Sequence, residues 1–95
     1  MEQEGVKYDK AHLSAELLET FKLVLPDLRK KYDKPWSHYE VDSAWVGGVV
    51  VGQHFYIFHV KEGEHAPYHN YTVNFEINHG KTIFKSAQEG YLSIL

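Results

Sequence analysis

The sequence Gly48-Val49-Val50-Val51-Gly52, together with residues 53–60 that follow it, decides the fold of this chain. Residues 53–60 are rich in Phe, Tyr, Ile and Val, which favour strands, and such a strand must be buried on at least one face. We predict that the three valines between the two glycines form the tip of a hairpin. We therefore expect a domain built around this strand, with an apolar hairpin tip as its main functional feature.

Two positions could reverse the chain before this strand. A turn at Gly47-Gly48 has the better local propensity, but it would place Phe55 and Ile57 on the polar face of the preceding strand. A three-residue tip, Val49-Val50-Val51 closed by Gly48 and Gly52, avoids this mismatch. It gathers the apolar residues of both strands on the face toward a helix: Tyr39, Val41, Trp45, Phe55 and Ile57. We predict this second turn, in which each valine would gain about 1.5–3 kcal/mol if a partner buried it.

Residues 14–32 predict one amphipathic helix. Ser14 is a suitable N-cap, and apolar residues follow at spacings of three and four. They form the stripe Leu17, Phe21, Val24 or Leu25, Leu28 and Tyr32. Pro26 should kink the helix near Lys22, and Asp33-Lys34-Pro35 should end it.

From Trp36 onward the sequence predicts only strands. They are expected at residues 38–45, 53–60, 70–77 and 82–87, with a short final strand at 91–95. Asn78-His79-Gly80-Lys81 predicts a second hairpin turn, and residues 1–10 predict a mobile or extended arm. We expect a single α+β domain over residues 1–95, in which a four- to five-stranded antiparallel meander wraps one long N-terminal helix.

The overall composition limits the possible functions. The chain of 95 residues has no cysteine, which excludes disulfides, thiolate metal sites and a catalytic thiol. Its net charge of -3 argues against nucleic acid as a partner. It begins without the features of a secretory signal and has no apolar segment long enough for a membrane. We expect a cytoplasmic protein without a membrane partner.

The seven histidines are the main candidates for metal binding or catalysis. His65 and His69 have a spacing that could bind a metal on a helix, but Pro67 argues against a helix there. One Ser-His-Asp combination is available, without the sequence context of a nucleophile: Asp42, Ser43 and His54. The sequence therefore predicts no catalytic residue, no metal site and no cofactor.

The order of these features resembles a stefin, the single-domain cytosolic type of cystatin, which inhibits papain-like cysteine proteases. A stefin has a glycine near the N-terminus, a long helix, a strand running into Gln-Val-Val-Ala-Gly at a hairpin tip, and an aromatic-rich strand. The matching features here are Gly5, the helix from about Leu13, Val49-Val50-Val51-Gly52 and Phe55-Tyr56-Ile57. Pro26-Asp27-Leu28 and the hairpin at residues 78–81 also fit. The likeness covers most of the chain in layout and is most specific from Glu40 to Ile57.

The resemblance implies a reversible, tight-binding inhibitor of papain-like, cathepsin-type cysteine proteases, and not an enzyme. The N-terminal arm and the two hairpin tips would form a wedge that fills the groove around the catalytic cysteine and blocks it sterically. The residues expected to contact the protease are Gly5, Val6, Gly48, Val49, Val50, Val51, Gly52, Asn78, His79 and Gly80.

Two other functions stay open. A cystatin-fold module could bind another protein or self-associate, without inhibiting a protease, through Tyr56 and Phe58. Alternation predicts these two residues on the outer face of the sheet, so a dimer is the alternative to the expected monomer. The third hypothesis is an enzyme or ligand carrier with a histidine pocket, which a helix filling the concave face of the sheet would remove.

Overall fold

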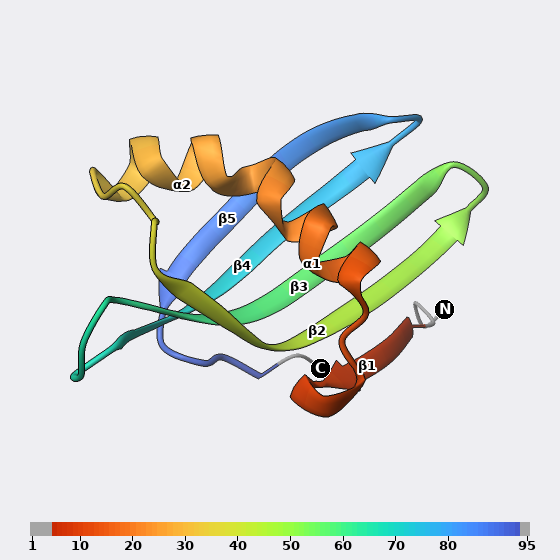
Figure 1. Cartoon of the computed structure of the whole chain (residues 1–95). Helices are drawn as coiled ribbons and strands as arrows, with labels where there is room; N and C mark the ends of the chain where they lie inside the picture. Colours follow the sequence, from red (N-terminus) through yellow and green to blue (C-terminus); the bar gives the residue numbers. More distant parts are fainter. Residues whose placement is uncertain (1–4, 94–95) are drawn as a thin grey trace.

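The chain folds as a five-stranded antiparallel sheet with a broken helix lying across one face (Figure 1). The computed structural model describes residues 5–93, apart from the side chains of Val49 and Val50. The strands follow one another in the order β1-β2-β3-β4-β5. They are β1 (Gly5–Asp9), β2 (Tyr39–Val50), β3 (Gln53–Glu62), β4 (His69–Asn78) and β5 (Lys81–Glu89). The predicted α+β fold class is confirmed, and it is the arrangement that the cystatin resemblance implies.

The helical segment begins, kinks and ends where the sequence predicts. Its parts are α1 (Ala15–Phe21), a 3-10 turn η2 (Lys22–Val24) and α2 (Leu25–Tyr32). Ser14 caps α1, because its hydroxyl oxygen accepts a hydrogen bond of 3.1 Å from the N–H of Leu17. Pro26 has no N–H to donate to the turn before it, so the α-helical pattern is interrupted there. Asp33 ends α2 in the left-handed conformation, with φ of 50°.

The core lies between the helical segment and the face of the sheet that it covers. Phe21 is completely buried and lies 5.2 Å from the ring of Phe58, which in turn stacks on Phe75 at 5.6 Å. Val24 and Leu28 are also completely buried. The predicted helical stripe is therefore the helix side of the core.

An extra residue in β2, Asp42, changes which side chains face the helix. Val41 pairs with Val60, whereas Ser43 pairs with His59, so Asp42 has no partner in β3. Such a β-bulge shifts the alternation by one residue and turns over every side chain beyond it. The face predicted for the second half of β2, and for the part of β3 paired with it, is therefore wrong.

The shift places Tyr56 and Phe58 in the core and moves three predicted core residues to the outer face. Phe58 is completely buried, and Tyr56 packs against the core. Trp45, Phe55 and Ile57 instead line one shallow pocket on the outer face. The predicted outer patch of Tyr56 and Phe58 is therefore wrong.

Both ends of the described chain lie against the sheet. Of the predicted arm, residues 5–9 form β1, which pairs antiparallel with β2, while residues 1–4 lie outside the described part. Residues 91–93 are not a strand, contrary to prediction, and residues 94–95 lie outside the described part. Leu92 is held by Thr72, whose Oγ1 accepts from its N–H at 2.8 Å, and by His59, whose Nε2 lies 2.8 Å from its carbonyl oxygen. No helix within residues 5–93 has the length and apolar character to cross a bilayer.

Because Phe58 faces the core and Phe55 faces outward, replacing each by alanine should lower the free energy of unfolding by different amounts. Phe58→Ala should lower the free energy of unfolding by about 3–5 kcal/mol, because it opens a cavity in the core. Phe55→Ala removes a partly exposed ring from the outer face and should cost less than half as much. Urea unfolding of both variants measures the difference, and equal losses would contradict the assigned faces.

Candidate functional site: the hairpin-tip edge

The first hairpin turns at Val51-Gly52. The strand β2 runs to Val50, which pairs with Gln53, and the two residues between them form the turn. The predicted three-residue turn, Val49-Val50-Val51, is thus one residue longer than the observed turn. The alternative turn at Gly47-Gly48 is not the observed one either. Val51 is 94% exposed, so at least this valine projects from the end of the hairpin. The side chains of Val49 and Val50 lie outside the described part.

The second hairpin turns where the sequence predicts. Its central residues, His79 and Gly80, have φ of 50° and 82°, the pair of positive angles that a tight two-residue hairpin requires. The side chain of Asn78 fixes the imidazole of His79, because its Oδ1 lies 2.7 Å from Nδ1. An amide oxygen can only accept, so Nδ1 of His79 is the donor in this hydrogen bond.

The two hairpin tips are in direct contact. The backbone N–H of His79 donates to the carbonyl oxygen of Gly52 at 2.7 Å. A Cβ on Gly52 would lie 2.9 Å from Cδ2 of His79, so the imidazole rests on the bare backbone of the first tip. Gly52 also has φ of 84°, where a side chain is strained. The hydrogen bond and the close packing join the tips into one surface.

Trp45 brings the start of β1 to the same edge of the sheet. Gly5 pairs with Gly47, and the indole of Trp45 lies across both of them. A Cβ on Gly5 would lie 2.3 Å from Trp45 Cε2, and one on Gly47 would lie 2.4 Å from Cη2. The glycines leave room for the ring, which is buried although it lies on the outer face. Val6 follows in β1, exposed and paired with Val46.

We call this end of the sheet the hairpin-tip edge. Figure 1 shows the turn between β2 and β3, the turn between β4 and β5 and the beginning of β1 at one end of the molecule. The edge comprises Gly5, Gly48, Val51, Gly52, Asn78, His79 and Gly80. The structure thus brings together the described residues predicted for the protease contact, except Val6, which lies one residue further along β1 and pairs with Val46. The sequence analysis did not predict the pairing of Gly5 with Gly47. The available signal was Trp45, a large aromatic residue two positions before Gly47.

The histidines of the described part form no metal site. No group of three or more His, Cys, Asp or Glu within residues 5–93 is placed to hold an ion. Ser43 does contact a histidine, but that histidine is His59, whose Nδ1 lies 3.2 Å from Oγ, and not His54. The second nitrogen of His59 contacts the carbonyl oxygen of Leu92. This pair braces the C-terminal segment on the sheet, which is a structural use of both residues.

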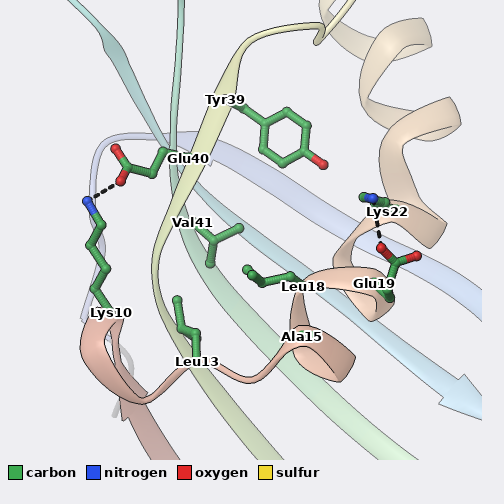
Figure 2. A pocket seen from close by; sticks show the side chains of 9 residues that line it. All are labelled: Lys10, Leu13, Ala15, Leu18, Glu19, Lys22, Tyr39, Glu40 and Val41. Atoms are coloured by element: carbon green, nitrogen blue, oxygen red, sulfur yellow. Dashed lines mark hydrogen bonds and ion pairs between the residues drawn. The ribbon is translucent and has the colours of Figure 1, made fainter.

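A pocket of about 490 Å³ lies between α1 and the beginning of β2, with Leu13, Leu18 and Val41 among its apolar lining (Figure 2). The charged groups around it are all paired, since Lys10 binds Glu40, and Lys22 binds Glu19 at 2.8 Å. The hydrogen bonds from Lys10 and then from Lys61 lower the pKa of the exposed Glu40 carboxyl. This pocket lies at the opposite end of β2 from the hairpin-tip edge.

Comparisons with known proteins give no match to a protein-family model, to a curated protein or to a solved structure.

The contact between the tips predicts different losses of stability for alanine substitutions at Gly52 and Gly80, although the two glycines have nearly the same φ. Gly80→Ala should cost about 1–2 kcal/mol of stability, from a side chain in the left-handed region alone, since nothing lies within 4 Å of its Cβ. Gly52→Ala should cost about 2–4 kcal/mol, because its Cβ also displaces His79.

Chemical unfolding measures both losses, and amide NMR shifts at residues 78–80 report whether the second tip moves. If Gly52→Ala costs no more than Gly80→Ala and leaves those shifts unchanged, the tips are not coupled.

Proposed function

We propose that this protein is a reversible inhibitor of papain-like cysteine proteases, which it blocks by inserting the hairpin-tip edge into the active-site groove. The observation that carries the proposal is the union of three separate segments in one narrow edge. The two tips are joined by the hydrogen bond from His79 to Gly52, and Gly5 begins the third segment beside them. This is the arrangement that the resemblance to stefins implies.

Val51 supplies apolar binding energy at the tip of this edge. It is almost fully exposed, so it contributes little to folding. Complete burial of a valine side chain by a partner is worth about 1.5–3 kcal/mol. An exposed apolar residue at a protruding turn therefore fits a contact with another protein.

The edge is also rigid enough to bind without much ordering. The backbone angles of Gly52, His79 and Gly80 are those of tight turns, and the contact between the tips fixes their relative position. A surface that is formed before binding loses little conformational entropy on association, so more of the contact energy appears as affinity.

The absence of side chains at several positions lets the backbone of the edge approach the walls of a groove. Gly48 stands where a stefin has glutamine, and a Cβ at this position would lie 2.7 Å from the carbonyl oxygen of Gln53. The proposed wedge is therefore narrower at Gly48 than in a stefin, because it has no glutamine side chain at this position. Inhibition is steric: the proposed inhibitor supplies no catalytic group and is not cleaved.

The proposed location follows the same resemblance. Stefins act in the cytosol, and a chain without cysteine needs no oxidising compartment to fold. We therefore place this protein in the cytoplasm as a monomer, with cathepsin-type proteases as its partners.

Inhibition of papain should depend on the exposed valine of the tip. Val51→Asp should raise the inhibition constant at least tenfold, because it places a charge in the apolar centre of the contact. Tyr68→Asp is the matched control, since it removes another exposed apolar side chain, in the loop at the far end of β3 and β4. The control should inhibit like the wild type.

Titration of papain and of a panel of cathepsin-type proteases with a fluorogenic substrate measures these constants. A wild-type protein that leaves every protease of the panel active at micromolar concentration would refute the proposal. It would favour the alternative of a cystatin-fold binding module without inhibitory activity.

A further inference from the structure

A second pocket lies on the other side of α1 from the pocket of Figure 2. Its volume is about 620 Å³, and it is bounded by β1, the segment before α1, α1 itself, β2 and β3. It is lined by Tyr8, His12, Ser14, Glu16, Leu17, Thr20, Val46, His54 and Tyr56. The proposed protease contact does not use this pocket.

The two pockets lie on opposite sides of α1, and residues three or four apart along the helix line the same pocket. Glu16 and Thr20, four residues apart, line the second pocket, while Glu19 and Lys22, three residues apart, line the pocket of Figure 2. Consequently each pocket receives one glutamate from the same helix. The two sites can be compared directly, because they differ in how that glutamate is paired.

Glu19 is neutralised and Glu16 is not. The carboxylate of Glu19 binds Lys22 at 2.8 Å, as Figure 2 shows. Across residues 5–93, no lysine, arginine or histidine nitrogen lies within 4.0 Å of the carboxylate of Glu16. The second pocket also has no lysine or arginine in its lining. With the two histidines of its lining, His12 and His54, in their neutral form, the pocket carries the single negative charge of Glu16.

The remaining walls suit a cation with an apolar body. Leu17 and Val46 provide aliphatic contacts, and Tyr8 and Tyr56 provide aromatic rings that attract cations. The pKa of Tyr56 is raised, mainly by burial and further by the negative charge of Glu16. The field of this carboxylate thus reaches the interior of the pocket.

We propose that this pocket is a binding site for a guanidinium or ammonium group on an apolar stem, with Glu16 as the charged partner. The stem lies on Leu17 and Val46, and the cation lies between the carboxylate and the tyrosine rings. An anionic ligand is excluded by the same charge. Glu16 also stands in the first turn of α1, where a carboxylate favours the helix N-terminus. That effect does not supply a counterion.

The cation could come from a free amine or guanidine, or from a Lys or Arg side chain of another protein. His54 lines the pocket one residue after Gln53, so one wall of the pocket is close to the first hairpin tip. A protein held at the hairpin-tip edge would have this pocket within reach. The binding site itself does not depend on the protease hypothesis.

The test is a titration of the full chain with butylguanidinium, followed by NMR, with butylurea as an uncharged ligand of similar shape. Butylguanidinium should shift the signals of Val46 and Tyr56 in a saturable way, and butylurea should bind at least fivefold more weakly. Glu16→Gln should weaken the binding of butylguanidinium at least fivefold. Glu19→Gln, on the opposite side of the same helix, should change it less than twofold.

Two further measurements separate a binding role of Glu16 from a structural one. Thermal unfolding should show that both variants remain folded at the temperature of the titration. Spectrophotometric titration should show a lower pKa of Tyr56 in Glu16→Gln than in the wild type, because the nearby negative charge is lost. A Tyr56 pKa that does not move would show that Glu16 does not act on this pocket.

A final arm distinguishes the two sources of the cation. The tripeptide Gly-Arg-Gly, blocked at both ends, should bind more tightly than butylguanidinium if a protein side chain is the ligand, and less tightly if a free guanidine is. Binding of either probe with loss in Glu16→Gln supports the site. Equal binding of butylguanidinium and butylurea, or equal losses in Glu16→Gln and Glu19→Gln, overturns it.

Discussion

The β-bulge at Asp42 is the constraint on which the rest of the structure depends, because it determines which face of the sheet the side chains of β2 occupy from Ser43 to Gly47, where a second register shift begins. With Asp42 left unpaired, Tyr56 and Phe58 meet the helix and Trp45 is turned to the outer face. An indole on that face must be covered to remain out of water. The pairing of Gly5 with Gly47 provides the cover, and it is this packing that holds β1 on the edge of the sheet. One extra residue thus places the N-terminal segment beside the hairpin tips.

The hairpin-tip edge is built mainly from backbone. Its positions are glycines or residues in tight turns, and the strongest contact within it is a main-chain hydrogen bond between His79 and Gly52. Such an edge is thin, and Val51, at 94% exposure, is the most exposed of the described large apolar side chains. These properties suit insertion into a groove, where shape matters more than charge.

The helix α1 has a second role besides filling one side of the core. Its buried side carries Phe21 into the sheet, while its two flanks form walls of separate pockets. The flank with Glu19 and Lys22 is internally neutral, and the flank with Glu16 is not. The pocket beside Glu16 shares Val46, His54 and Tyr56 of β2 and β3 with the strands that lead to the first tip.

The sequence by itself determined the local structure of this protein. The Ser14 cap, the interruption before Pro26, the end of the helix at Asp33 and the turn at His79-Gly80 follow from short-range rules, since each depends on the backbone chemistry of a few neighbouring residues. Tertiary structure alone decided the faces of β2 and β3, the two-residue turn at Val51-Gly52 and the docking of β1. A bulge leaves no local signal as clear as proline or glycine. Its position is set by the packing of Phe58 against Phe21 and of Trp45 against Gly5, contacts between residues far apart in the chain.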